Sequence, residues 1–216
     1  MTRDSGAQRP EPGAPSPEPR APSPEPGAGV HVDGVVKVGG GLLAHPAHLE
    51  AVLSAVATAA TSHRILIVPG GGLFADVVRR VDREVTLSDD AAHWMAVLAM
   101  DQYAHLITSR LAGSVLVEDS IDVDTALARG RLPVLAPSRW LRAVDPLPHT
   151  WDVTSDSIAA WVAGVVSARR LVLVKPPGTA ASGSVDTYFE RALPTGVTPV
   201  VVPADQDEAL VAALRP

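Results

Sequence analysis

Short apolar runs alternate with longer stretches of helical periodicity along most of the chain. The runs are apolar almost throughout, as in residues 64–69, Arg-Ile-Leu-Ile-Val-Pro, which is typical of strands buried on both faces of a parallel sheet. The stretches between them place apolar residues three and four positions apart, as with Leu49, Val52 and Leu53 in residues 46–60. This alternation predicts an α/β protein: a single three-layer αβα domain with a largely parallel central sheet.

The same pattern sets the bounds of the expected elements. Strands are predicted at residues 32–38, 64–69, 114–118, 132–136, 171–175 and 199–202, and helices at residues 46–60, 73–81, 88–111, 155–168 and 206–214. The helix at 88–111, with Ser88 as its N-cap, is apolar nearly all the way round. We expect it to be buried on several sides, either centrally or at a subunit interface, and therefore expect a homo-oligomer.

Residues 1–29 differ in composition from the rest of the chain. Proline recurs every two or three positions, and the segment Ala-Pro-Ser-Pro-Glu-Pro occurs twice. Almost no large apolar side chain is present to offset the entropy of ordering. We expect a disordered, proline-rich tail at 1–29 and a folded domain at 30–216.

Composition narrows the classes of function. The net charge of -6 argues against nucleic-acid and anionic-membrane partners, and the lack of cysteine rules out disulfides, zinc–thiolate sites and thiol nucleophiles. No metal site is expected, because His45 and His48, although three apart, have no carboxylate pair nearby. His105 is expected in the core. No apolar signal segment or membrane-spanning run is evident, so we expect a cytoplasmic protein acting on a small molecule.

Two glycine clusters follow the first two predicted strands. Gly39, Gly40 and Gly41 end the first, and residues 70–72 (Gly70, Gly71 and Gly72) end the second. Such loops let the backbone approach a ligand and aim its N–H groups at an anion, and a helix N-terminus follows each loop. One cluster could equally be a tight strand–helix turn, but two at equivalent positions favour an anion site.

Lys37 separates two interpretations of these loops. Residues 39–44 fit the dinucleotide fingerprint G-x-G-x-x-A, but the strand at 64–69 does not end in the carboxylate that would hold a ribose. Lys37 lies inside a strand, where burying an ammonium is costly unless an anion meets it. A polyphosphate meets that need, so the sequence favours phosphoryl transfer over dinucleotide binding.

Asp156 and Lys175 can each be explained either by local structure or by a role in the phosphate site. Asp156 opens the helix at 155–168 and can simply complement the helix dipole there. Lys175 ends the strand at 171–175 and can simply reach out to solvent. Alternatively, both belong to the site, with Lys175 as a second cation for the transferring phosphoryl group.

Together, the segments 37–41, 70–72, 154–160 and 171–178 resemble the amino acid kinase family, and the resemblance covers nearly all of residues 32–216. Within this family, segments 68–79, 90–101 and 151–156 resemble the small kinases of methanofuran biosynthesis. Those enzymes use ATP to convert an aminomethylfuran methyl phosphate to its diphosphate. The resemblance thus implies a transferase of one-carbon cofactor metabolism.

The resemblance also implies roles for individual residues. Catalytic roles fall to Lys37, Asp156 and Lys175, with the aspartate orienting the lysines rather than acting as a strong base. The nucleotide phosphates are assigned to Gly39, Gly40, Gly41 and Gly178, and the acceptor to Gly70, Gly71, Gly72, Arg79, His93 and Ser155. The implied cofactors are ATP and Mg²⁺, with the ion held mainly by the nucleotide phosphates.

The chain departs from the family pattern at three places. Gly41 stands where the family has serine, Thr154 stands where it has asparagine, and Pro176-Pro177-Gly178 replaces an acidic turn beside the nucleotide. These changes motivate an alternative, a non-enzymatic storage module for oxometalates or nucleotides on the same fold. A uridylate or acylamino-acid kinase is a further alternative.

Overall fold

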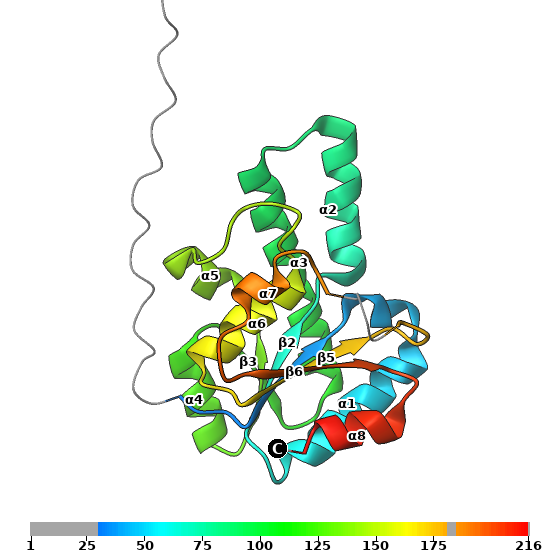
Figure 1. Ribbon diagram of the computed structural model, residues 1–216, viewed down its shortest axis with the longest axis vertical. Helices are drawn as coiled ribbons and strands as arrows, with labels where there is room; N and C mark the ends of the chain where they lie inside the picture. The colour runs from blue at the N-terminus through cyan, green and yellow to red at the C-terminus, as the bar shows by residue number, and fades with distance from the viewer. Residues whose placement is uncertain (1–29, 181–184, 216) are drawn as a thin grey trace, which may run out of the picture.

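The protein is built on a six-stranded, all-parallel sheet with helices on both faces (Figure 1). The computed structural model describes residues 30–180 and 185–215, so the tail predicted at 1–29 lies outside the described residues. The sheet order is β3-β4-β2-β1-β5-β6. Its strands are β1 (Gly34–Val38), β2 (Ile65–Pro69), β3 (Ser114–Val117), β4 (Leu132–Leu135), β5 (Arg170–Lys175) and β6 (Thr198–Pro203). The predicted three-layer α/β architecture is confirmed.

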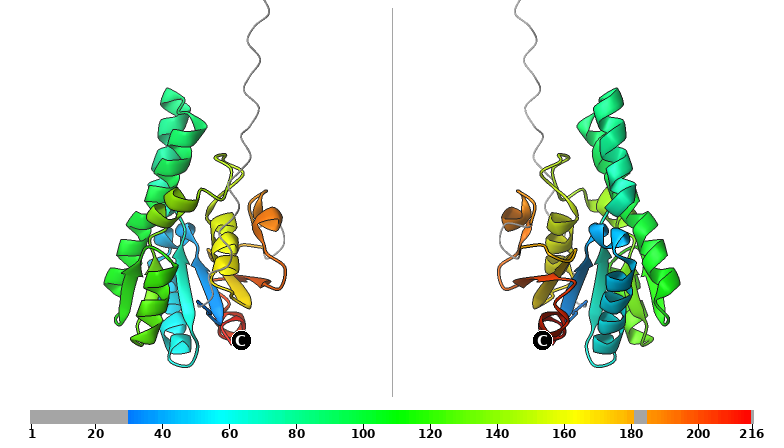
Figure 2. Two further views of the ribbon diagram at one scale, coloured as in Figure 1. Left: turned by 90° about the vertical axis from the view of Figure 1, so that its left-hand side faces the viewer. Right: turned by 90° about the vertical axis from the view of Figure 1, so that its right-hand side faces the viewer.

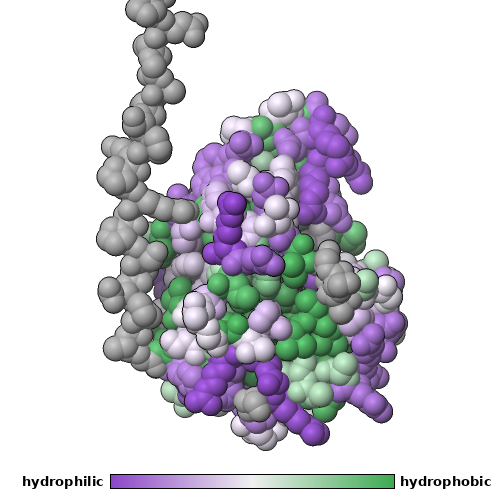
Figure 3. Space-filling view, viewed as in Figure 1, coloured by the Kyte–Doolittle hydropathy of each residue, from purple (hydrophilic) through white to green (hydrophobic). Residues whose placement is uncertain are grey.

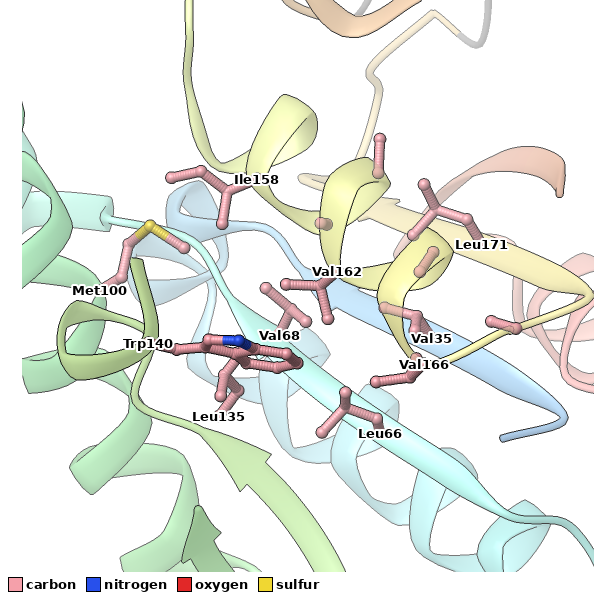
Figure 4. Close-up of a cluster of buried hydrophobic side chains, with 14 of the residues drawn as sticks. Val35, Leu66, Val68, Met100, Leu135, Trp140, Ile158, Val162, Val166 and Leu171 are labelled. Carbon is pink, nitrogen blue, oxygen red and sulfur yellow. The ribbon is translucent and has the colours of Figure 1, made fainter. Parts of the chain in front are cut away.

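Two cores, one on each face of the sheet, explain why the strands are apolar throughout. Alternate strand residues point to opposite faces, so Val35 and Leu66 meet the helices of one face while Val36 and Ile67 meet those of the other. Figure 4 shows the first core, where Trp140 lies among side chains from the sheet and from helix α6 (Ser155–Val165). The second core holds helices α1 (Pro46–Ala60) and α8 (Asp207–Ala213).

The helices follow the predicted order with several additions. The elements not predicted are the short helices α4 (Ser120–Ala128), α5 (Ser138–Val144) and α7 (Phe189–Ala192), and the 3-10 turn η1 (Gly40–Ala44). They are too short to show a clear apolar period. Helix α6 stops earlier than predicted, at Val165, because Ser167 adopts a left-handed backbone conformation with φ of 49°.

Helices α2 (Gly72–Val85) and α3 (Asp89–Arg110) form a pair that projects beyond the end of the sheet (Figures 1 and 2). Helix α2 runs four residues further than predicted, because the apolar period gives way to the polar residues 82–84 although the helix continues. Ser88 caps α3 as predicted, its hydroxyl accepting from Ala91 N at 3.2 Å. Figure 3 shows many hydrophilic residues over the projecting pair, with a few apolar ones such as Val85, which is 63% exposed.

Helix α3 is buried over only part of its length. Its second half packs in the cores, whereas Met95 and Leu98 in the first half are exposed by 36% and 43%. Central burial, one of the two expected positions for this helix, therefore holds only for its second half, and burial at a subunit interface stays a prediction. His105, expected in the core, is exposed. Within the described residues, no helix combines the length and apolar character that crossing a membrane requires.

Candidate active site

The carboxyl ends of the parallel strands bring the candidate residues to one edge of the sheet. Strand alternation places Lys37 on the same face as Val35, and Lys175 on the same face as Leu173. Both therefore lie on the face covered by α6, which begins with Asp156 in its first turn. Because β1 and β5 are neighbours in the sheet, the two lysines approach the same carboxylate.

Asp156 bridges the two lysines. Lys37 Nζ lies 2.8 Å from Asp156 Oδ1, an ion pair without the directional geometry of a hydrogen bond, and Lys175 Nζ donates to Oδ2 at 2.5 Å. All three side chains are buried, with 5%, 3% and 8% of Lys37, Asp156 and Lys175 exposed. Asp156 and Lys175 thus belong to one buried cluster with Lys37. The structure favours this over a separate helix-capping role for Asp156 and a solvent-facing role for Lys175.

The cluster has an excess positive charge. Burial by itself raises the pKa of Asp156, but the charges of Lys37 and Lys175 outweigh burial and hold that pKa below its ordinary value. The pKa of Lys175 is lowered by burial and by the nearby charge of Lys37, against the opposing effect of Asp156. Two cations around one carboxylate leave one buried positive charge, and that arrangement suits an anionic ligand.

Lys37 and Lys175 are the only lysines among the 18 lysine and arginine residues of the chain. All the other basic residues counted there are arginines. An ammonium is a compact point charge on a flexible stem, whereas a guanidinium is a broad planar fork, so the two are not interchangeable at a buried position. The rarity of lysine is thus a signal in the sequence itself that connects these two residues.

The two glycine loops pack backbone against backbone. A Cβ on Gly40 would lie 2.1 Å from Gly72 N, and a Cβ on Gly70 would lie 2.5 Å from Gly40 N. Gly72 also has a positive φ of 53°, which favours glycine. Glycine is required here by this contact as well as by any approach of a ligand.

The N–H groups of the loops divide into two sets. Gly39 N donates to Val174 O at 2.9 Å and Gly70 N donates to Val38 O at 2.8 Å, so both are already used within the sheet. The expectation that Gly39 N–H binds phosphate therefore needs correction. The two later glycines of each loop are Gly40, Gly41, Gly71 and Gly72. Their N–H groups donate no hydrogen bond to any of the residues that the structure describes. These four can serve an anion.

A pocket of about 290 Å³ lies between the glycine loops and the α2–α3 pair. The side chains of Val97, Met100 and Ile158 contribute an apolar wall. Five of the residues predicted to bind the acceptor line this pocket: Gly71, Gly72, Arg79, His93 and Ser155. Gly70, which was also predicted to bind the acceptor, does not line it. The structure thus brings most of the predicted acceptor set together around one cavity.

Arg79 is held at this pocket by two neighbours. Its guanidinium pairs with Asp76 at 2.8 Å and lies 5.1 Å from the centre of the Trp151 ring. The indole N–H of Trp151 donates to Asp82 Oδ2 at 2.8 Å. The segment before α6 is thereby fastened to α2.

His93 faces the pocket as an uncharged ring. Burial, and next the charge of His149, lowers the pKa of His93 to about 4. The two imidazoles stack with centres 4.0 Å apart. His149 in turn contacts Asp90 through Nδ1 at 2.9 Å and Asp145 through Nε2 at 2.8 Å. Sequence reasoning missed His149, which no local pattern distinguishes.

The turn after β5 differs from the expectation for a nucleotide-binding glycine. Gly178 has a φ of 73°, and its N–H donates to Asp205 Oδ2 at 3.2 Å. A Cβ on Gly41 would lie 2.6 Å from Pro176 Cγ. Two of the departures from the family pattern, Gly41 and Pro176, thus occupy adjoining space.

Among the described residues, no group of three histidine or carboxylate side chains is placed to hold a metal ion.

One family model, one curated relative and several solved structures are similar to this chain. A sequence model of the amino acid kinase family matches residues 34–176. The chain is 29% identical over 140 residues to a [5-(aminomethyl)furan-3-yl]methyl phosphate kinase of Methanocaldococcus jannaschii. That match covers 64% of this chain and 63% of the relative, so it spans less than two thirds of the relative's length.

Solved structures share the fold. Uridylate kinase from Archaeoglobus fulgidus superposes with a TM-score of 0.54 at 17% identity, covering 72% of this chain and 69% of that one. UMP kinase from Ureaplasma parvum superposes with a TM-score of 0.58 at 14% identity, covering 84% of this chain and 93% of that one. At these identities the likeness concerns the fold alone.

Proposed function

This chain belongs to the amino acid kinase family, and from that premise we propose that it transfers a phosphoryl group from ATP to a small phosphorylated acceptor. The observation that carries the proposal is the buried cluster in which Lys37 and Lys175 both contact Asp156. Its excess positive charge lies at the edge of the sheet where the two glycine loops meet. Phosphoryl transfer depends mainly on positioning and on neutralising charge, and this cluster supplies both.

The proposed step forms one bond and breaks one. An acceptor oxygen attacks the γ-phosphorus of ATP in line, and the bond from that phosphorus to the β–γ bridging oxygen breaks as ADP leaves. Lys37 and Lys175 stabilise the negative charge on the phosphoryl oxygens and the leaving group. The N–H groups of Gly40, Gly41 and Gly72 contribute to the same stabilisation. Mg²⁺, held mainly by the nucleotide phosphates, completes the proposal.

Asp156 acts in this scheme as a positioning group. Both of its oxygens face lysines, and its lowered pKa makes it a weak base. An acceptor that is itself a phosphate needs no base, because its attacking oxygen is already ionised near neutral pH. The chemistry of the cluster therefore suits a phosphate acceptor better than an alcohol.

We infer that the acceptor is an aminomethylfuran methyl phosphate, converted to its diphosphate in one-carbon cofactor biosynthesis. The name of the 29% identical relative supports this inference, and so does the pocket. Arg79 can pair with a phosphate, the Trp151 ring and the apolar wall suit a flat furan, and Asp89 at the rim suits an ammonium.

The projecting pair of helices supports the further proposal of a homo-oligomer. Leu73 and Val77 on α2 are exposed by 56% and 54%, and Leu98 on α3 by 43%. Exposed large apolar side chains grouped on two adjoining helices are typical of an interaction surface.

The test is an ATP-consumption assay with three acceptors: [5-(aminomethyl)furan-3-yl]methyl phosphate, UMP and an acylamino acid. Lys37→Ala should lower kcat by about 10²–10³-fold, the effect expected on removing one group that stabilises the developing charge. Arg79→Ala should mainly raise KM for the furan phosphate, with Arg80→Ala, its neighbour on α2, as the matched control. Wild-type protein that consumes ATP with none of the three, or retains an oxometalate instead of nucleotide, would contradict the proposal.

A further inference from the structure

A second carboxylate, that of Asp186, holds the start of α6. It accepts hydrogen bonds from Thr154 N at 2.9 Å, from Thr154 Oγ1 at 2.7 Å and from Ser157 N at 3.0 Å. The hydroxyl of Ser157 donates to its other oxygen. One side chain thus satisfies two backbone N–H groups and two hydroxyls at the N-terminus of one helix.

The residues that Asp186 contacts lie on both sides of Asp156 in the sequence. Thr154 precedes it by two residues and Ser157 follows it directly, and Asp156 N donates to Thr154 Oγ1 at 3.4 Å. Asp156 has little freedom to move when the residues on both sides of it are tied to one carboxylate. The bridge from Asp156 to the two lysines depends on that placement, because its contacts of 2.8 Å and 2.5 Å tolerate little displacement.

Asp186 comes from a part of the chain that the family match does not reach. The match ends at residue 176, and Asp186 lies between β5 and α7. Tyr188 N donates to Asp152 O at 3.3 Å, and α7 packs beside α6, as Figure 2 shows. The segment between β5 and β6 therefore packs against α6 and braces the helix that carries Asp156.

Asp186 also contributes charge. It is one of the groups that favour the protonated form of Lys175, raising its pKa against the larger effect of burial. Asp186 does not contact either ammonium group and acts on Lys175 only through its charge, while its own oxygens accept from Thr154 and Ser157. The α6 N-terminus, which could otherwise attract a phosphate, is already occupied by this carboxylate.

We propose that Asp186 is a positioning residue, which fixes Asp156 between Lys37 and Lys175 by holding the residues on both sides of it. This inference rests on the proposed kinase function for its catalytic consequence. Its structural consequence, the protonation of Lys175, can be measured without any substrate.

The experiment compares Asp186→Asn with Asp119→Asn. Asp119 is the matched control, because its carboxylate likewise caps a helix, accepting from Asp122 N at 2.9 Å at the start of α4, away from the cluster. With ¹⁵N-labelled lysine, only Lys37 and Lys175 give side-chain signals. Removing the Asp186 charge should move the titration of Lys175 to lower pH. Asp119→Asn should leave it unchanged.

Steady-state kinetics give the second measurement. Asp186→Asn should lower kcat by about 10–100-fold, as loss of an outer partner of a site residue commonly does, while KM for ATP changes little. Asp186→Glu, which keeps the charge, should restore the Lys175 titration more fully than kcat. If Asp186→Asn does not fold, Ser157→Ala removes one of the four contacts, and a smaller fall in kcat is expected.

Two results separate the possible failures. If the Lys175 titration and kcat of Asp186→Asn match those of Asp119→Asn, the role of Asp186 is wrong. If wild-type protein transfers phosphate to no acceptor but the Lys175 titration still shifts in Asp186→Asn, the proposed function is wrong and the positioning of the lysine cluster by Asp186 stands.

Discussion

At the residue scale, the site is defined by two ammonium groups that compete for one carboxylate. Lys37 and Lys175 are buried and share Asp156, and the charge of Lys37 disfavours the charged form of Lys175, lowering its pKa. Phosphoryl transfer needs both in their charged form. The protonation of Lys175 therefore becomes a measurable property of the reaction.

The lowered pKa of Lys175 in the protein without substrate predicts how kcat/KM depends on pH. Below its folded-state pKa the side chain is charged and active, and as pH rises through that pKa, which lies below the ordinary 10.5, the charge and the activity are lost. Lys175→Arg stays charged throughout. We expect a pH–rate profile with an alkaline decline in wild-type protein and, at lower overall activity, none in Lys175→Arg. The same decline in both proteins would assign it to another group.

Gly41 and Pro176 should behave as a coupled pair. Because a Cβ on Gly41 would lie 2.6 Å from Pro176 Cγ, Gly41→Ala should lower the free energy of unfolding by about 1–3 kcal/mol through overpacking. In Gly41→Ala/Pro176→Ala, most of that loss should disappear. Urea unfolding of both single variants and the double variant measures the coupling, and additive effects would show that the two residues do not share this space.

At the element scale, the segment between α5 and α6 closes one side of the pocket. His149 fastens it to α3 through Asp90 and by stacking on His93, and Trp151 fastens it to α2 through Asp82. These contacts join elements that are far apart in the chain. The pocket wall is therefore assembled by packing between the projection and the α6 face.

This fastening predicts an unusual titration for His93. Its imidazole should titrate near pH 4, because burial and the neighbouring His149 both disfavour the charged ring. His149→Gln removes the second cause, so the pKa of His93 should rise while staying below the ordinary 6.5. NMR titration of the histidine ring signals in wild-type protein and in His149→Gln measures both values. A wild-type His93 that titrates near 6.5 would contradict the stacked arrangement.

At the scale of the whole molecule, the sheet places all the chemistry at one edge and the α2–α3 pair extends beyond that edge. The second core, on the face of α1 and α8, is closed by apolar packing. The projection, by contrast, carries large apolar side chains that remain exposed in one copy of the chain. Its surface is where association is expected.

The proposed oligomer can be tested by sedimentation. Wild-type protein should sediment as a dimer or larger, and Val77→Glu/Leu98→Glu should shift it toward monomer, because burying a carboxylate in an interface is costly. Ile121→Glu is the control, since Ile121 is 74% exposed on α4, outside the projection. A monomeric wild type would count against the proposal, and an equal shift in the control would move the interface elsewhere.

Much of the fold followed from the sequence alone. Strand and helix order, the parallel sheet and the bounds of α1 are set by local apolar periodicity, which the chain shows plainly. That Lys37 and Lys175 lie on one face depends on the register of β1 with β5, which pairs Lys37 with Leu173 and which the sequence did not predict. Short helices such as α4 and the exposed half of α3 were not predictable in the same way, because they depend on what packs against them.

The sequence by itself determined the kind of site: a buried lysine and two glycine loops at the carboxyl ends of neighbouring parallel strands. Only the tertiary structure decided that Lys175 shares Asp156 with Lys37, that Gly39 N–H is already used, and that Asp186 braces α6. The physical reason is the range of the interactions. Apolar period and turn chemistry act over a few residues, whereas an ion pair or a shared carboxylate joins residues that only the completed packing brings within 3 Å of each other.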